Sequence, residues 1–521
     1  MTGPLPVLSV VVPVGTVDHR FDLALEALRS QSHTRLEIIL VLDGLDPDAR
    51  AAVHDVAARD PRVVVVENNE RLGAGNARNV GLRTATGEYV AFADADDVVP
   101  ADAYRRLLGV FAQSAPDVVS GRAEQFTADG REVTYWTVDD PLWTTGGRGL
   151  RLSDTPPLAF DHTPWNKVFN RTWLCETGVE FATHTTCEDV SWWARLVVRA
   201  TVDVLPEVVY RHRRHDGSVT AGIGRGDDLS DWVVQTRAAV ETYEAHGARE
   251  ARAALGRRLI RREAWTRVRA IDALSPSDAQ VLADFVAWIG SWAEPNDFEQ
   301  LSAFPGTAYA LLRQRETHLV AAFIRAFDQP ADDAVERWRR LAPEVGRAIA
   351  PGRDLATDLW RERMFRPVVD AAQRREVLPI RPETVVEFWE AFVGDGLDDN
   401  EQRVLSALRD GAVEDVAFLR RNRRVHPVAD RRLGALRISF EGLEGSAPGR
   451  ILRDRDGVTT VVHQGLLSSD TVVASSARPG DLWSVEFELS GGRRHRVEVA
   501  AAPSGITRVR NAIRARSGRL R

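Results

Sequence analysis

Three acids follow an apolar run in the stretch VAFADADDVVP, residues 90–100. The apolar residues predict a strand that is buried on both faces, where an unpaired carboxylate would be too costly to desolvate. We therefore expect Asp94, Asp96 and Asp97 to lie at the exit of this strand. Alternate acids on an extended segment can present oxygen ligands to a hard divalent cation such as Mg²⁺ or Mn²⁺. The alternative is an acidic turn, with Asp97 near the start of a helix at residues 101–111.

The segments around this stretch alternate between strand and helix. Hydrophobic periodicity predicts strands at residues 7–14, 36–43, 62–68 and 89–93, and helices at residues 21–31, 47–60 and 75–86. Repeated β-α-β units predict a parallel sheet wrapped by helices, and such α/β sheets usually bind nucleotides at the exits of their strands. The three acids would then lie at a ligand-binding edge.

The length of the chain and the changes in residue pattern along it predict several domains. A chain of 521 residues is too long for one ordinary core, so we expect about two to four domains. Residues 1–225 should form the α/β domain. Residues 226–425 have helical spacing and many tryptophans, which favours a helical linker or interaction domain whose aromatic residues serve packing. After a basic joint at residues 420–432, short alternating runs up to residue 521 predict a small β-sandwich over residues 426–521.

Composition argues against several classes of protein. A net charge of −7 is not that of a general nucleic-acid binder, so we expect no nucleic-acid partner. No apolar run approaches a membrane-spanning length, and the first residues are not those of a secretory signal. Two cysteines, Cys175 and Cys187, give no disulfide framework. The cytoplasm is therefore the expected compartment.

The last stretch, residues 505–521, carries six arginines and no acid. Such a cationic strip could hold an anionic polymer through many weak charge contacts. It could also rest on anionic lipid at the inner face of the cell membrane. A third interpretation is that the strip serves only solubility.

The stretch LGAGNARNVG, residues 72–81, follows a predicted strand and opens a predicted helix. This position invites a dinucleotide-binding interpretation. However, Arg78 replaces the third glycine of that fingerprint, and the motif follows the third strand rather than the first. An arginine in the first turn of a helix beneath a nucleotide instead suits contact with a phosphate or a base edge.

Together, the series LSVVVPV, LDG and NNERLGAGNARNVGLRTATGEYVAFADADD resembles the nucleotide-binding half of the family 2 glycosyltransferases of GT-A fold. The resemblance covers residues 7 to about 220. It implies that Pro13 and Asp43 border the uracil and ribose of a nucleotide-sugar donor, with Arg78 nearby. One departure is Leu42, which stands where the family usually has an acid or an asparagine.

The same resemblance makes Asp94-x-Asp96 the DxD motif of the family. It implies that Asp94 faces the ribose of the donor. Asp96 would face a divalent cation, Mn²⁺ or Mg²⁺, which such enzymes use as a cofactor.

Two further segments resemble the acceptor side of the family. HTPWNKVFNRTWL, residues 162–174, is similar to its WNKLF segment, and Glu188-Asp189 matches its ED motif. Transfer of a sugar to a hydroxyl requires a base, so the resemblance implies Asp189 as the base, with Glu188 helping to hold the acceptor or Asp189. Lys167 would orient Glu188 or the acceptor, or would be an ordinary surface lysine. Cys187 is expected to be a small buried residue rather than a nucleophile.

YRHRRHDGSVT, residues 210–220, resembles the third signature of the family. The resemblance implies that Arg213, His215 and Ser218 lie over the pyrophosphate, where negative charge develops on the leaving nucleoside diphosphate. His215 falls where relatives supply a third metal ligand, whereas His212 is not expected to bind metal. Without the preceding motifs, a solvated basic loop would be the preferred interpretation.

The family implies a single displacement at the anomeric carbon, with inversion of configuration. The expected activity is metal-dependent transfer of a sugar, with UDP-N-acetylglucosamine as the favoured donor, to a hydroxyl of a cell-surface polymer. The order of a family 2 domain, helices and a β-sandwich is similar to bacterial enzymes that decorate wall teichoic acid, a polyol phosphate, and that form trimers through their C-terminal part. Alternatives are capsule or lipid-linked glycan synthesis with another donor, and a non-catalytic glycan-binding scaffold.

Overall fold

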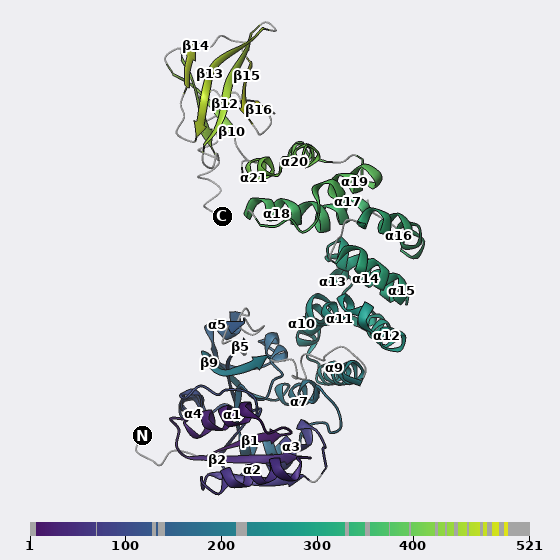
Figure 1. Cartoon of the computed structure of the whole chain (residues 1–521). Coiled ribbons are helices and arrows are strands. Elements are labelled where there is room, and N and C mark those ends of the chain that lie inside the picture. Colours follow the sequence, from purple (N-terminus) through teal and green to yellow (C-terminus); the bar gives the residue numbers. More distant parts are fainter. Residues whose placement is uncertain are drawn as a thin grey trace. The chain divides into compact units, whose positions relative to one another are not determined.

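The computed structural model (Figure 1) describes residues 7–68, 70–127, 132–133, 141–214, 227–328, 333–349, 355–374, 376–394, 397–421, 426–432, 435–441, 446–455, 458–468, 473–476, 482–488 and 494–498. The chain divides into two compact units. The first comprises Met1–Gln300 and Leu312–Thr317, and the second comprises Leu301–Leu311 and His318–Arg521. The predicted site residues belong to the first unit.

The first unit is built around one mixed β-sheet. Its parallel half contains, in spatial order, β3 (Val63–Asn68), β2 (Leu36–Asp43), β1 (Leu8–Val14) and β4 (Tyr89–Phe92). The connecting helices are α1 (His19–Arg29), α2 (Pro47–Ala57) and α3 (Ala74–Thr84). The strands and helices predicted for this part of the chain are therefore confirmed, with ends that differ by a few residues at most.

The sheet continues beyond β4 with strands of mixed direction. In spatial order these are β8 (Lys167–Asn170), β5 (Val118–Thr127), β9 (Val202–Arg214) and β7 (Gly147–Leu150), while β6 (Glu132–Val133) pairs with β5. β8 runs antiparallel to both β4 and β5, whereas β5 and β9 are parallel. The helical segments of this half are α4 (Ala103–Ser114), α5 (Pro141–Thr145), η1 (Pro156–Phe160), α6 (Arg171–Glu176) and α7 (Glu188–Val197).

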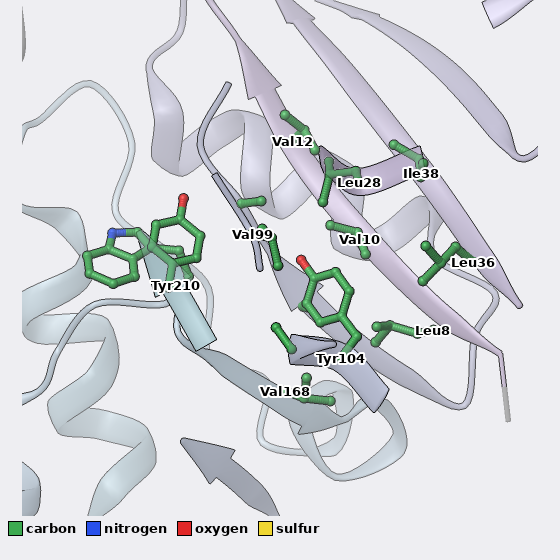
Figure 2. Close-up of a cluster of buried hydrophobic side chains, with 14 of the residues drawn as sticks. Leu8, Val10, Val12, Leu28, Leu36, Ile38, Val99, Tyr104, Val168 and Tyr210 are labelled. Atoms are coloured by element: carbon green, nitrogen blue, oxygen red, sulfur yellow. The ribbon is translucent and has the colours of Figure 1, made fainter. Parts of the chain in front are cut away.

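One face of the sheet packs on α1 and α4. Successive side chains of a strand point to opposite faces, so Leu8, Val10 and Val12 of β1 share this face. All three are almost fully buried, and Figure 2 shows them near Leu28 of α1 and Tyr104 of α4. Burial of this kind explains why the strand is a nearly continuous apolar run rather than an alternating one.

The opposite face packs on α3 and α7. Val11 of β1 lies close to Gly81 of α3. Phe92 of β4 meets Trp192 of α7 edge to face, with ring centroids 5.8 Å apart. Both faces of the central strands are therefore covered, and polar side chains are confined to the strand ends.

The carboxyl ends of β1 and β4 mark the place where strand order reverses. Successive strands run from β1 outward to β2 and β3, and the chain then returns to place β4 on the other side of β1. In open α/β sheets, ligands bind beyond the carboxyl ends of the strands at such a switch point. Because β4 ends at Phe92, Asp94 and Asp96 lie at this edge, as predicted.

Helices dominate the described residues between 227 and 421, as predicted. They are α9 (Asp227–Ala245), α10 (Arg249–Arg258), η2 (Leu259–Glu263), α11 (Ala264–Arg269), η3 (Ile271–Ala273), α12 (Pro276–Trp292), α13 (Pro295–Glu299), α14 (Ala303–Arg313), α15 (Thr317–Phe327), α16 (Ala334–Ala348), α17 (Leu355–Leu359), η4 (Trp360–Phe365), α18 (Arg366–Arg374), α19 (Pro382–Phe392), α20 (Asp399–Arg409) and α21 (Val413–Arg421). Their aromatic residues pack on one another, as Trp288 does on Phe285 and Trp338 on Phe327. No helix among the residues described is both long and apolar enough to cross a membrane.

The first of these helices packs on the sheet domain. Gln235 of α9 accepts a hydrogen bond from Ser191 of α7 (2.5 Å). Asp231 of α9 accepts the backbone N–H of Thr186, just before α7 (2.7 Å). α9 therefore fixes the segment that leads into α7, and it lies in the same compact unit as the sheet.

The described strands of the C-terminal part form two small antiparallel sheets, in agreement with the predicted β-sandwich. One contains β10 (His426–Arg432), β11 (Ala435–Glu441) and β14 (Val473–Ser476), and the other contains β13 (Val458–Ser468), β12 (Ser446–Arg455), β15 (Leu482–Glu488) and β16 (Arg494–Glu498). The expectation that residues 420–432 form only a basic joint is wrong, because α21 extends to Arg421 and β10 begins at His426. The arginine-rich stretch 505–521 lies outside the described residues.

The close approach of α3 to β1 can be tested at Gly81. A Cβ at this position would lie 2.2 Å from a Val11 methyl carbon. Gly81→Ala should therefore destabilise the protein by about 1–3 kcal/mol, the usual cost of overpacking a core, and lower the midpoint of urea unfolding.

Gly109 of α4 provides the matched control, because a Cβ there would have no neighbour within 4 Å. Gly109→Ala should leave stability unchanged or raise it by up to about 1 kcal/mol, since alanine is the better helix former. Equal stability of the two variants would contradict the packing of α3 on β1.

Candidate active site

The end of β9 lies against the segment that follows β4. The backbone N–H of Asp94 donates to Tyr210 Oη (3.0 Å), and the Tyr210 ring stacks on Trp165 with centroids 4.3 Å apart. Arg213 Nε donates to the backbone oxygen of Asp96 (2.9 Å). Residues from the DxD motif and from the third signature thus meet at the carboxyl edge of the sheet, although they are more than a hundred positions apart in the sequence.

Asp97 supports this junction rather than the next helix. Its side chain is 2% exposed. One carboxylate oxygen accepts the backbone N–H of Arg213 (2.6 Å), and the other lies 3.1 Å from His212 Nδ1. Burial raises the pKa of the Asp97 carboxyl, while His212 opposes that rise. The alternative that Asp97 serves the following helix is wrong, because α4 begins at Ala103 with Asp102 as its N-cap.

Asp96 is the predicted metal ligand, and it is half-buried at this edge. Proteins commonly hold Mg²⁺ through one or two carboxylates together with substrate phosphates and waters, so a single carboxylate here fits such an ion. Among the described residues, no cluster of three or more His, Cys, Asp or Glu side chains could hold an ion alone. The other predicted metal ligand, His215, and the predicted diphosphate contact Ser218 lie outside the described residues.

Arg78 of α3 connects the DxD motif to the ED motif. Its guanidinium donates to Asp94 Oδ1 from Nη2 (2.8 Å) and to Glu188 Oε1 from Nη1. The side chains of Arg78 and Glu188 are only 7% and 11% exposed, so these charges are stabilised mainly by one another. Burial opposes the charged form of Arg78, but Asp94 and Glu188 outweigh it and raise the pKa of the guanidinium above its ordinary value. Contact of Arg78 with a nucleotide stays a prediction.

Close packing of α3 brings Arg78 within reach of both carboxylates. A Cβ on Gly75, in the first turn of α3, would lie 2.2 Å from the backbone oxygen of Ala182 and 3.0 Å from Glu188 Cγ. One turn further on, the Asn79 amide exchanges two hydrogen bonds, both 2.9 Å, with the backbone of Phe181. The glycine-rich stretch therefore has a packing role that requires no dinucleotide.

Asp43 ends β2 and organises the loop that leads into α3. Its two carboxylate oxygens accept the backbone N–H groups of Leu72 (2.8 Å) and Gly73 (2.9 Å). Pro13 lies near the end of β1, in register with Val41 of β2, and is half-buried. Both predicted nucleoside contacts thus lie near the carboxyl edge of the sheet. Their contact with uracil and ribose stays a prediction.

Asp189, the predicted base, has a histidine partner. Asp189 Oδ2 lies 2.9 Å from His162 Nδ1, and the two side chains are 20% and 30% exposed, respectively. Burial alone would raise the pKa of the Asp189 carboxyl, but His162 and Arg78 outweigh it, so the pKa is lowered. Asp189 is therefore an ionised carboxylate that remains partly accessible.

Cys187 immediately precedes the ED motif as the N-cap of α7, with φ of 57°. Burial raises the pKa of its thiol to about 12. The thiolate needed for nucleophilic attack is therefore scarce at neutral pH. The expectation that Cys187 is buried is wrong, because its side chain is half-buried.

Lys167 is anchored inside the domain. It is 1% exposed, and its ammonium lies 2.8 Å from Asp161 Oδ2. The ammonium also donates to the backbone oxygen of Thr163 (2.7 Å) and to Asn166 Oδ1 (2.9 Å), and it lies over the ring of Trp193. The expectation of an ordinary surface lysine is wrong, because these partners, which lie in the turn that leads into β8, enclose the side chain.

Sequence reasoning did not single out Asp161, His162 or Tyr210 as site residues. One signal could have drawn attention to the first two. The chain contains a single lysine, Lys167, among 68 basic Lys and Arg residues. Ammonium and guanidinium differ in size, hydration and hydrogen-bond geometry, so a lone lysine in such a chain marks a place where only the ammonium fits.

Lys167→Arg tests the ammonium cage, by which we mean the acceptors from Asp161, Thr163 and Asn166 that surround the ammonium of Lys167. The larger planar guanidinium should fail to satisfy the three acceptors around the ammonium, even though the charge is kept. We expect a loss of about 3–5 kcal/mol in the free energy of unfolding by urea, the range for breaking a buried ion pair.

Arg83→Lys is the matched control for that substitution. Arg83 pairs with Glu180 at 3.0 Å, but the two side chains are 58% and 64% exposed. Changing an exposed pair should alter stability by about 1 kcal/mol or less. A Lys167→Arg variant as stable as the wild type would show that the cage does not select an ammonium.

Comparisons with known proteins agree with the motifs. Residues 9–177 match the family model of glycosyl transferase family 2. The uncharacterized glycosyltransferase YibD of Escherichia coli (strain K12) is 27% identical over 217 residues, which cover 41% of this chain and 63% of that protein. The uncharacterized glycosyltransferase EpsJ of Bacillus subtilis (strain 168) is 33% identical over 115 residues, or 22% of this chain and 33% of that protein. The chain thus spans less than two thirds of either relative.

A solved structure shares the fold. The crystal structure of a fragment of S. aureus TarS in complex with UDP-GlcNAc has a TM-score of 0.50 and 16% sequence identity, and the match covers 61% of this chain and 91% of that one. At this identity the likeness establishes the fold alone. The family model matched by residues 9–177 and the fold shared with the TarS fragment agree on a family 2 glycosyltransferase domain of GT-A layout in this part of the chain.

Proposed function

We propose that the chain is a metal-dependent, inverting glycosyltransferase. It transfers a sugar from a nucleotide-sugar donor, with UDP-N-acetylglucosamine favoured, to a hydroxyl of a cell-surface polymer. The observation that carries this proposal is the convergence of the DxD motif, the ED motif and Arg213 at one edge of the sheet, with Arg78 buried between the two acidic motifs.

The donor diphosphate binds beside Asp96 and Arg213. When bound, Mn²⁺ or Mg²⁺ supplies positive charge against the diphosphate, and Asp96 with His215 would hold it. Arg213 adds a cation that is already fixed in place, since it donates to the backbone of Asp96 and lies over the ring of Phe126. A preorganised charge of this kind stabilises the leaving group without reorganisation during the reaction.

Asp189 takes the proton of the acceptor hydroxyl as the oxygen attacks the anomeric carbon. The bond from that carbon to the diphosphate oxygen breaks, and its electron pair leaves with the nucleoside diphosphate. Attack from the face opposite the leaving group inverts the configuration. Glu188 supports the segment that carries Asp189, because its carboxylate is paired with Arg78.

A polyol phosphate such as wall teichoic acid is the acceptor that we favour. The support is the order of domains and the six arginines of residues 505–521, which suit a polyanion. The fold shared with a TarS fragment solved with UDP-GlcNAc supports the donor. Assembly into a trimer through the C-terminal sheets, and peripheral contact of the basic stretch with the inner membrane face, belong to the same proposal.

Donor binding should stabilise the native protein in a metal-dependent way. We expect UDP-N-acetylglucosamine with Mn²⁺ to raise the midpoint of thermal unfolding, because a ligand at about a hundred times its Kd contributes about 2.7 kcal/mol by mass action. Asp96→Asn should abolish the shift. Asp48→Asn, at an exposed position of α2, should retain it. GDP- and CMP-sugars are the comparison donors, and a shift with one of these alone would replace the donor assignment.

Turnover separates an enzyme from a glycan-binding scaffold. Asp189→Asn should keep the donor-induced shift and lose about 10²–10⁴-fold in UDP release from UDP-N-acetylglucosamine, the usual contribution of a general base. Poly(ribitol phosphate) is the acceptor to supply. Absence of any nucleotide-induced shift in the wild type would overturn the transferase proposal and favour the scaffold.

A further inference from the structure

The turn that carries His162 is fixed by the residue before it. Asp161 is 1% exposed and uses both carboxylate oxygens. Thr163 Oγ1 and Asn166 Nδ2 donate to it, each at 2.8 Å, and Lys167 forms the ion pair at 2.8 Å. Such a satisfied buried network rigidifies the backbone that it holds. The place of His162 is therefore set by the core rather than by a mobile loop.

The opposite partner, Asp189, is held just as firmly. Its neighbour Glu188 is paired with Arg78, and Ser191 on the next turn of α7 donates to Gln235 of α9. The 2.9 Å contact between His162 Nδ1 and Asp189 Oδ2 thus joins two independently anchored elements. An exposed ion pair between two free side chains would have no such geometric constraint.

From this arrangement we propose that His162 is a positioning residue for Asp189 and that protonation of His162 switches the base off. The inference rests on the proposed function, in which Asp189 takes the acceptor proton. A neutral imidazole that donates Nδ1–H to Oδ2 fixes the carboxylate and leaves the other oxygen for the acceptor hydroxyl. An imidazolium in the same place neutralises the carboxylate and makes it a weaker base.

Charged groups from several elements face this pair. Asp161 lies on the turn of His162 itself, Asp189 and Glu188 lie on α7, and Glu263 lies on η2. Lys167 and Arg78 are the cations that act on Asp189. Burial opposes protonation of His162, but Asp189, Glu263 and Asp161 outweigh it, so the pKa of His162 is raised above 6.5.

The sign of the pH dependence follows from these directions. Because the pKa of His162 is raised, the imidazolium persists to a higher pH than in a free histidine, and activity should be low there. Activity should rise as the pH passes upward through the raised pKa. This rise of activity on the acid side of the pH profile is called the acid limb. In the wild type, Asp189 itself cannot produce the acid limb, because the pKa of its carboxyl is lowered from 3.8.

Two substitutions at position 162 separate orientation from titration. UDP release from UDP-N-acetylglucosamine with Mn²⁺, and with water as the acceptor, would be measured between about pH 5.5 and 9. His162→Asn keeps an N–H donor without the titrating imidazole. The acid limb should therefore move below its wild-type midpoint, toward the pH at which Asp189 itself titrates, and the plateau should stay within about threefold of the wild type. His162→Leu has neither an N–H donor nor a titrating group. Its kcat should therefore fall about 10–100-fold, while the KM for the donor should change by less than about twofold.

His54→Asn is the matched control. His54 Nε2 lies 2.7 Å from Glu67 Oε1, a similar histidine–carboxylate contact, but that pair lies on α2 and β3 and is 49% and 36% exposed. The variant should keep both the wild-type plateau and the acid limb. Thermal unfolding of each variant would show that it is folded.

A second readout needs no turnover. In the ¹⁵N-histidine-labelled protein, the imidazole signal that disappears in His162→Asn should titrate above 6.5. Asp189→Asn should lower that midpoint by about one unit or more, as expected when an opposite charge within about 4–6 Å is removed.

The outcomes distinguish this inference from the proposed function. An acid limb that keeps its wild-type midpoint in His162→Asn, or a titration that does not respond to Asp189→Asn, would overturn the switch. A kcat of His162→Leu equal to that of the wild type would overturn the positioning role. A loss of kcat in His162→Asn as large as that in Asp189→Asn would also overturn it, because His162 would then be the proton acceptor. If the wild type releases no UDP while the titration responds as expected, the proposed donor or activity is wrong and the coupling of His162 to Asp189 stands.

Discussion

A buried guanidinium between two carboxylates is the contact on which the candidate site depends. Without Arg78, Asp94 and Glu188 would be partly or largely buried anions that had lost the cation paired with both. With it, the exit of β4 and the start of α7 are held at a fixed separation. The glycines of α3 make this contact available, because the helix must approach both β1 and the Ala182 backbone closely for Arg78 to reach its partners.

Polar groups on both sides of Arg78 are likewise held by charged or hydrogen-bonding partners. On the donor side, Asp97 accepts from the Arg213 backbone, and Arg213 in turn donates to the backbone of Asp96. On the acceptor side, Glu188 is followed by Asp189, which contacts His162. Each of these groups has a charged or hydrogen-bonding partner within the domain. A buried polar group without a partner costs free energy. When all the groups of such a network are hydrogen-bonded, they specify one arrangement of the side chains.

The parts of the fold that follow from local pattern could be predicted from the sequence. Strands buried on both faces leave continuous apolar runs, and this allowed β1 to β4 and the placement of Asp94 and Asp96 at a strand exit to be predicted. The acidic pair at the start of α7 was also expected from its motif. Strand β10 was expected to be part of a basic joint, because Pro427 and several charged residues interrupt its alternation.

The partners of the site residues could not be predicted, because sequence spacing does not encode long-range contacts. His162 and Asp189 are 27 positions apart, and Asp97 and His212 are 115 apart. Asp97 was expected near the start of a helix because only its neighbours in sequence were considered, whereas β9 brings it a backbone N–H and an imidazole. For Lys167, a role toward Glu188 or the acceptor and a surface position were both expected, and neither included its contacts with Asp161, Thr163 and Asn166.

The burial of the chain's single lysine has a chemical consequence. Reagents that acylate primary amines, such as succinimidyl esters, attack the unprotonated amine and require access to it. Lys167 is 1% exposed and engaged with Asp161, so in the native protein it is shielded from such reagents. Side-chain acylation at this position would then report the opening of the domain that holds the candidate site, with no competing signal from other lysines. Amine-directed crosslinking would likewise leave the native side chains unmodified, whatever the state of assembly.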